Sequence, residues 1–255
     1  MGFSHYRTQA VVLASQDRGE ADRIFHLYTK DFGKLRAWAI SERKITSKLR
    51  GGLEPWGHSE VEFIEGRNRK IIVDTASLHR YQAIRNNIEK IRCAGRVVSA
   101  LDSLCKEEIP EQHIWFFLLH VLQILDTEER EQWDFELVYF YFLWNIFSLL
   151  GYQPFLEACK NCKRAVDLEK TYFFFSEGGI LCRDCTKKKN IARALSQKIA
   201  IELSPFLLQT MRALTNQKMG ENNLNAISMA SQERSLLEEL SSRYTAQLSV
   251  YSYES

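Results

Sequence analysis

The chain has 255 residues, of which 45% are hydrophobic and 12% aromatic, so it is long enough to bury a sizeable core. Six cysteines are too few for a disulfide-dense secreted framework of this length, and the first nine residues lack the apolar stretch of a signal peptide. The formal net charge of +2 identifies no partner by itself.

Short apolar runs separated by turn residues predict five β-strands in roughly the first 75 residues. The predicted strands cover residues 7–14, 24–29, 34–40, 60–64 and 70–74, with turns at 17–20, 31–33 and 66–68. Five short strands in so small a segment favour a closed barrel, because closure removes the exposed strand edges.

The third predicted strand has two chemically different faces. Alternation puts Leu35, Ala37 and Ala39 on one face, and Lys34, Arg36, Trp38 and Ile40 on the other. Small inward residues suit a tight barrel. An outward strip of two cations and an indole suits a nucleic-acid backbone with a base stacked beside it. The alternative is that Trp38 is a core residue under a neighbouring loop.

Basic residues concentrate in two segments of an otherwise acidic chain. Residues 30–50 hold seven basic and two acidic residues, and residues 160–193 hold nine basic and four acidic residues. This distribution is typical of a polyanion-binding surface, although a solvated charged surface is the alternative. The candidate residues for binding a nucleic-acid backbone are Lys34, Arg36, Trp38, Arg43, Lys44, Lys48 and Arg50, with Arg7 and Arg23 as helpers.

From residue 77 the apolar period changes to three or four, which predicts helices over residues 81–105, 111–125 and 129–150. The third is apolar nearly all round and should be the centre of a bundle. Its longest apolar stretch, 135–150, is too short to span a bilayer. We expect Gly151 and Pro154 to end it, another helix after Arg193 with Ser196 as its cap, and a last helix over 233–248.

Four cysteines form the most specific motif of the chain. Cys159 and Cys162, and Cys182 and Cys185, are two C-x-x-C pairs separated by 19 residues, with a strand-like aromatic run at 172–175 between them. Two such turns supply the four thiolates of a tetrahedral zinc site, and four sulfur ligands leave no open position for catalysis. We expect one structural zinc ion, with a redox dithiol or free thiols as the alternatives.

The sequence contains no P-loop, G-x-G-x-x-G, H-E-x-x-H or G-x-S-x-G motif. Asp17, Glu20 and Asp22 form an early acidic cluster that would suit magnesium in a nuclease. Arg18 and Arg23 lie among these carboxylates, so a surface turn with ion pairs is the simpler interpretation. We do not expect an enzyme.

Several segments together resemble the bacterial recombination mediator family RecO. They are residues 6–13 (YRTQAVVL), 19–24 (GEADRI), 33–35 (GKL), 47–49 (SKL), 53–55 (LEP) and 151–154 (GYQP), followed by the two cysteine pairs with Gly178 and Gly179 between them. The resemblance covers about residues 3–215, and it is specific because order, spacing and cysteine pattern agree.

The resemblance implies an α+β protein: a five-stranded OB-fold barrel (residues 1–78), an α-helical bundle domain (79–155 and 192–255) and an inserted four-cysteine, zinc-ribbon-like module (156–191). It also implies a protein of DNA repair and homologous recombination that binds and anneals single- and double-stranded DNA. Together with RecR it would load RecA onto DNA coated by single-stranded DNA-binding protein, whose acidic C-terminal peptide it would engage. We therefore expect a cytoplasmic, nucleoid-associated protein without a membrane segment.

One departure from the family pattern bears on DNA affinity. Relatives usually carry Ala-Lys-Gly and further basic residues after the third strand, whereas this chain has Ile40, Ser41 and Glu42 after Ala39. Affinity is then weaker, or it depends more on the basic residues at 43–50. A zinc-stabilised protein–protein adaptor without DNA binding and a metal-dependent nuclease remain the alternatives. The order of the tail after Asn216 stays open.

Overall fold

The computed structural model describes residues 4–66, 69–127, 134–166, 171–189, 191–216, 224 and 226–253. The chain divides into two compact units, Met1–Phe135 and Glu136–Ser255. The domain boundaries that we place after residues 78, 155 and 191 stay a prediction.

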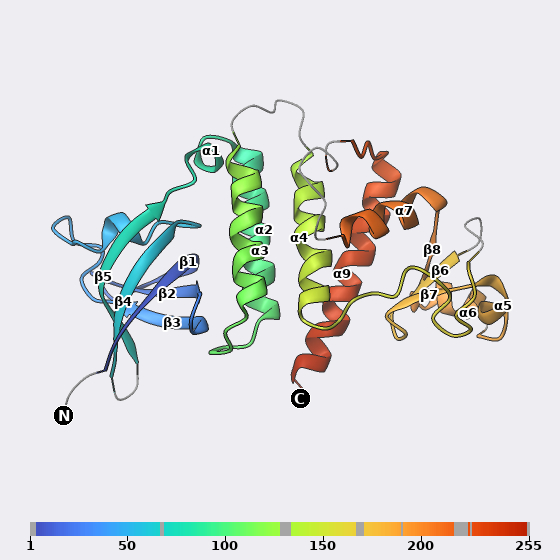
Figure 1. Cartoon of the computed structure of the whole chain (residues 1–255), viewed down its shortest axis with the longest axis horizontal. Coiled ribbons are helices and arrows are strands. Elements are labelled where there is room, and N and C mark those ends of the chain that lie inside the picture. Colours follow the sequence, from blue (N-terminus) through green and yellow to red (C-terminus); the bar gives the residue numbers. More distant parts are fainter. Residues whose placement is uncertain are drawn as a thin grey trace. The chain divides into compact units, whose positions relative to one another are not determined.

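Five strands form a closed barrel at the start of the first unit (Figure 1). They are β1 (Ser4–Arg18), β2 (Asp22–Thr29), β3 (Gly33–Ala39), β4 (His58–Glu65) and β5 (Lys70–His79), in the order β1-β2-β3-β5-β4. The first half of β1 pairs with β4 and its second half with β2, so one long strand closes the barrel. The predicted five-stranded barrel is confirmed, and its architecture is that of an OB-fold.

The barrel core combines small and branched side chains with the rings of Phe25 and Phe63. Leu35, Ala37 and Ala39 of β3 are at most 2% exposed and belong to this core, as their alternation predicts. On the opposite face of β3, Arg36 is exposed and Trp38 is half-buried. Strand periodicity therefore separates the core face from the candidate binding face correctly.

The turn between β2 and β3 requires glycine. Gly33 has φ +64°, and a Cβ atom there would lie 2.1 Å from the carbonyl oxygen of Ile109. Beside this close approach, the backbone of Glu107 forms a parallel bridge with Lys34, and Glu108 N donates to Lys34 O at 2.8 Å. The segment after the second helix is thus fastened to β3.

The first unit continues with α1 (Gln82–Arg85), α2 (Ile88–Leu104) and α3 (Gln112–Asp126), of which α2 and α3 pack side by side (Figure 1). A continuous helix over 81–105 is therefore wrong at residues 86–87. Asn87 is extended, and its side chain accepts hydrogen bonds from the backbone N–H groups of Glu89 and Lys90, which starts a new helix. Ile88 is 61% exposed for the same reason.

The second unit is built around α4 (Phe135–Leu149), whose residues 137–147 are almost all buried. Asn145 is fully buried and donates to the carbonyl oxygens of Tyr141 (2.8 Å) and Leu214 (2.7 Å). Gly151 follows with φ +84°, so the helix ends where we predict. Among the described residues, we find no helix with both the length and the apolar character that a bilayer crossing needs.

A small sheet and further helices complete this unit. The strands β6 (Thr171–Phe174), β7 (Gly179–Leu181) and β8 (Ala200–Leu203) pair in the order β7-β6-β8. The helices are α5 (Arg183–Lys187), α6 (Ile191–Ser196), α7 (Pro205–Leu214) and α9 (Ser231–Tyr253). The predicted strand at 172–175 and the helix at 233–248 are confirmed.

The expected helix with Ser196 as its cap is wrong. Ser196 is the last residue of α6, and residues 200–203 form strand β8 against β6. The cap belongs to Ser204, whose Oγ accepts from Leu207 N at 3.0 Å, with Pro205 in the first turn of α7. Pairing with β6, a tertiary interaction, overrides the local helical spacing here.

Candidate nucleic-acid interface and metal centre

The basic segment after β3 is a loop that continues into a short 3₁₀ helix, η1 (Arg50–Gly52). Leu49 and Leu53 from this segment are buried in the barrel core. Lys48 and Arg50 flank Leu49 and are exposed. The burial of Leu49 therefore holds two basic side chains at the barrel surface.

The start of this loop is fastened to the turn between β1 and β2. Ser41 N donates to Asp22 Oδ1 at 2.8 Å, and Arg43 N donates to a carbonyl oxygen of the turn at 3.0 Å. Glu42 is 4% exposed, and its Oε2 lies 3.2 Å from Arg23 Nη1, an ion pair whose angles do not make a hydrogen bond. Glu42 thus points inward as an anchor and is not an added surface charge.

The basic side chains differ in how far the protein itself neutralises them. Arg43 Nη1 lies 3.4 Å from Asp17 Oδ2 and 3.4 Å from the carbonyl oxygen of Gly19. Four exposed members of the predicted set form no ion pair with another residue of the described ranges: Arg36, Lys44, Lys48 and Arg50. These four carry the positive charge that is available to a polyanion.

Lys34 has a partner inside the protein. Its Nζ donates to the carbonyl oxygen of Asp102 and lies 3.5 Å from Asp102 Oδ1, which leaves the side chain 15% exposed. The same carboxylate lies 3.5 Å from His26 on the neighbouring strand. Lys34 therefore joins β3 to α2, and its charge is largely compensated before any ligand binds.

Trp38 is half-buried on the outer face of β3. The guanidinium of Arg69 lies over its ring at 4.9 Å from the ring centroid. The residue is thus neither an inward core residue nor a bare surface indole. A stacked cation and indole form a flat platform that also suits a nucleobase.

Two of the three acidic residues around the β1–β2 turn, Asp17 and Asp22, are used in ion pairs and backbone contacts. Arg23 Nε donates to Asp17 Oδ1 at 2.8 Å, and this hydrogen bond lowers the pKa of Asp17. Asp22 accepts from the backbone of the basic loop, as described above. In the part of the chain that the structure describes, the only acidic, histidine or cysteine group able to hold a metal is the cysteine cluster. The interpretation as a surface turn with ion pairs is confirmed.

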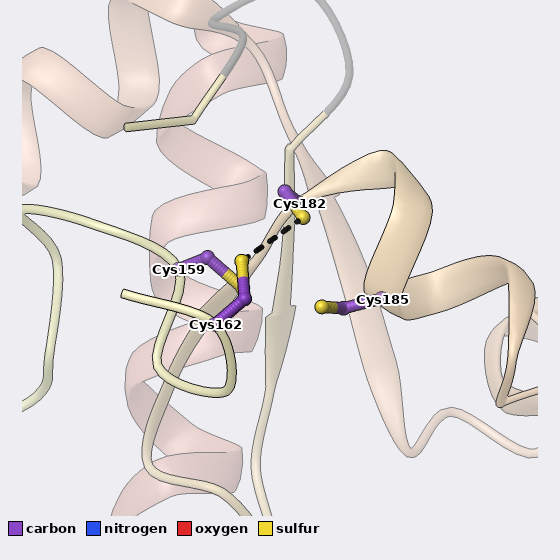
Figure 2. A group of neighbouring side chains, drawn as sticks. All are labelled: Cys159, Cys162, Cys182 and Cys185. Carbon is purple, nitrogen blue, oxygen red and sulfur yellow. Dashed lines mark hydrogen bonds between the residues drawn. The ribbon is translucent and has the colours of Figure 1, made fainter. Parts of the chain in front are cut away.

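The four cysteines come together from two tight turns (Figure 2). Cys159 and Cys162 lie on a loop in which Lys163 N donates to Cys159 O at 2.8 Å, and Lys163 has φ +60°. Cys182 follows β7 directly, and Cys185 lies on α5, where Thr186 N donates to Cys182 O at 3.0 Å. Each C-x-x-C pair is thus held by its own backbone hydrogen bonds.

The sulfur atoms fit a tetrahedral metal. All four lie within 4.8 Å of one another, and the Sγ atoms of Cys162 and Cys182 are 3.8 Å apart. Zinc–sulfur bonds of about 2.3 Å place the sulfurs of a regular tetrahedron about 3.8 Å apart. A small inward movement of the other side chains would complete the site. Residues 167–170, between the pairs, lie outside the described ranges.

The thiols are prepared to different degrees for metal binding. Hydrogen bonds from Arg164 lower the pKa of Cys162 to about 6. Burial raises the pKa of Cys159, but backbone N–H groups lower it by more. Asn161 donates to Cys185 and lowers its pKa, whereas burial and the neighbouring sulfurs raise it by more, to about 11. A divalent cation would displace the thiol protons, because it favours four thiolates.

Three contributors to these sites were not anticipated from the sequence. Arg69 stacks on Trp38, Asp102 neutralises Lys34, and Asn161 donates to Cys185. Only Asn161 had a local signal, since it lies between the two cysteines of the first C-x-x-C pair. The other two are brought close by the fold.

A closed barrel with an exposed basic loop, followed by helices and a four-cysteine cluster, defines an α+β protein with a candidate nucleic-acid interface and a candidate metal centre. The family model "Recombination protein O N terminal" matches residues 1–79, and "Recombination protein O C terminal" matches residues 85–248. The chain belongs to this RecO family, and its role accordingly lies in DNA repair and recombination.

Curated relatives with the name "DNA repair protein RecO" agree with this assignment. The protein of Pelotomaculum thermopropionicum is 30% identical over 213 residues, which cover 83% of this chain and 77% of the relative. That of Dehalococcoides mccartyi strain BAV1 is 28% identical over 92% of this chain and 86% of the relative. That of Acetivibrio thermocellus is 26% identical over 95% of both.

Proposed function

We propose that this protein is a non-enzymatic DNA-binding recombination mediator. Its family membership supports the biological role. The observation that carries the binding activity is the loop after β3, which is anchored by Glu42 and Leu49 and leaves the cations of Lys44, Lys48 and Arg50 exposed. Arg36, on the neighbouring strand, adds a fourth such charge.

These cations would neutralise phosphates along a DNA strand, while a base stacks near Trp38. Lys34 and Arg43 already face carboxylates, so we assign them a smaller part. Because phosphate contacts carry little sequence information, the binding is weakly selective and falls with salt. Annealing follows when two strands are held with their charge compensated and their bases accessible.

The four cysteines would hold one structural zinc ion, since four sulfur ligands fill a tetrahedral zinc completely. This module would stabilise its half of the protein and present Lys187, Lys188 and Lys189, which are exposed beside it. They would extend the DNA track or contact RecR. With RecR, the protein would help load RecA onto DNA that is coated by single-stranded DNA-binding protein. It would engage the acidic C-terminal peptide of that coating protein. This activity would take place in the cytoplasm, at the nucleoid.

The test is the affinity for a fluorescent single-stranded oligonucleotide, measured by anisotropy. Replacing the four free cations Arg36, Lys44, Lys48 and Arg50 by alanine should weaken binding about tenfold or more at low salt. All four are exposed, so the thermal unfolding temperature should hardly change. The same affinity is measured after replacing Lys187, Lys188 and Lys189 by alanine. A smaller loss of affinity than in the fourfold variant would place the main DNA contacts on the barrel.

The same samples test the absence of catalysis and the annealing activity. Labelled DNA should stay intact with magnesium, and complementary strands should pair faster with the wild-type protein than with the fourfold variant. Wild-type affinity in the fourfold variant would show that the barrel loop does not bind DNA. Cleavage of the DNA would refute the non-enzymatic role.

A further inference from the structure

A pocket of about 670 Å³ opens on the barrel beside Trp38. Its walls come from the end of β1, the middle of β3, both sides of the β4–β5 hairpin and the segment at 107–108. This volume lies in the range of pockets that hold small ligands and exceeds what a row of phosphate contacts requires. The pocket lies entirely within the first compact unit.

One wall of the pocket is flat and suited to a planar group. Trp38 lies across from Ile24 in the pairing of β2 with β3, and Arg69 stacks on its indole at 4.9 Å. Single-stranded bases are commonly held on aromatic rings and on guanidinium planes. A base that enters the pocket would extend the stack that Trp38 and Arg69 already form.

The pocket also holds three glutamates, Glu65, Glu107 and Glu108, among the basic residues Arg18, Arg36, Arg69 and Lys70. Glu65 and Glu108 are compensated by Lys70, which lies 3.4 Å from Glu65 and pairs with Glu108. Glu107 forms no ion pair with another described residue, and its backbone is fixed beside β3 by the bridge to Lys34. Glu107 therefore offers the pocket a carboxylate that no ion pair within the described ranges engages.

A carboxylate only accepts hydrogen bonds, so it needs a donor from the ligand. Cytosine, adenine and guanine carry an amino group, whereas thymine presents carbonyl oxygens on both sides of its single N–H. Acidic side chains accept hydrogen bonds from the cytosine amino group in known DNA complexes. Arg18 and Arg36 of the same pocket would face the phosphates, and a base amino group would satisfy Glu107.

We propose that this pocket takes a single unstacked, amino-bearing base from a bound DNA strand. The base continues the stack that Trp38 and Arg69 form, and Glu107 accepts a hydrogen bond from its amino group. The inference rests on the proposed DNA binding and adds a base preference that phosphate contacts do not supply.

The experiment compares the affinities for two 20-nucleotide strands of equal charge, one of thymine alone and one of alternating thymine and cytosine. The wild-type protein should prefer the cytosine-containing strand about fivefold, the lower end of what a base-edge hydrogen bond supplies. Glu107→Gln should abolish this ratio, because an amide both donates and accepts. Glu20→Gln, which removes an equally exposed charge away from the pocket, should keep it.

Trp38→Ala should weaken binding of both strands about tenfold through loss of stacking, and Trp38→Phe should restore most of it. Equal affinities of the wild-type protein for the two strands, or an unchanged ratio in Glu107→Gln, would overturn the base pocket while leaving DNA binding in place. If neither strand binds, the proposed function itself fails.

Discussion

The barrel surface and the cysteine cluster both depend on a few charged or ligating side chains. They differ in how many of these side chains the fold leaves available to a ligand. All four cysteines converge within 4.8 Å, so each residue of the motif is available to a metal. Of the basic residues near the barrel, Lys34 is bound to Asp102 and Arg43 faces Asp17, while Lys48 remains free. A local motif therefore predicts its site completely, whereas a count of charges overstates the surface that a ligand meets.

The largest effect is expected in the cysteine cluster. Cys182→Ser should release the proposed metal and lower the free energy of unfolding of the second unit by several kcal/mol, because the binding free energy of a structural metal contributes to folding. Metal content by elemental analysis and thermal unfolding measure both effects. Cys105→Ser, a buried thiol of the first unit, is the control and should keep the metal. Stoichiometric zinc in Cys182→Ser would refute the site.

Lys34 and Arg36, two cations of β3, should differ in their effects on stability and on DNA binding. Lys34→Met should cost about 1–3 kcal/mol of stability, because the Asp102 carbonyl oxygen loses its donor and the Asp102 carboxylate keeps only His26. It should leave DNA binding almost unchanged. Arg36→Met should do the reverse, since Arg36 is exposed. Urea unfolding and DNA titration separate the two roles. Equal effects of both variants on DNA affinity would contradict the distinction.

Glu42 should give a smaller effect. Glu42→Gln removes the ion pair with Arg23, which still contacts Asp17, so we expect a loss of about 1 kcal/mol. The measurement is the urea midpoint, with Glu20→Gln as an exposed control. A midpoint as high as that of the wild type would show that Glu42 does not anchor the basic loop.

The smallest effect concerns pH. Burial lowers the pKa of His58, and His79 lowers it further. The folded barrel therefore takes up this proton less readily than the unfolded chain. The contribution of His58 to the free energy of unfolding is full above the ordinary pKa of 6.5. It is lost as the pH falls from there towards the lowered pKa of the folded state.

Between pH 7 and pH 5, His58→Gln should thus lose less stability than the wild type, as measured by urea midpoints. The amide retains a donor for Gln9, which lies 3.1 Å from the His58 ring. His113→Gln, at an exposed position on α3, should follow the wild type. If the urea midpoints of all three proteins fall equally between pH 7 and pH 5, His58 does not cause the loss of stability at low pH.

Much of the fold is readable from local patterns. The alternation in β3 assigns Leu35 and Ala37 to the core, and the C-x-x-C spacing identifies the cluster. The errors occur where a longer-range contact or a cap overrides periodicity. Asn87 interrupts the helical stripe by capping α2, and pairing with β6 makes residues 200–203 a strand.

The candidate interface is only partly predictable for the same reason. Lys34 and its acceptor on Asp102 are 68 residues apart in the chain, so no sequence window reveals that this charge is compensated. Arg69 likewise reaches Trp38 only after β3 and β5 have paired. The contact of the seven predicted DNA-binding residues with DNA stays a prediction.

The most direct test of the central claim is the salt dependence of single-strand binding. Log affinity of the wild-type protein should fall linearly with log salt concentration. The variant without the side chains of Arg36, Lys44, Lys48 and Arg50 should show a slope shallower by about 3, since each lost phosphate contact removes about 0.7. An identical slope in both proteins would show that DNA is bound elsewhere and would contradict the account.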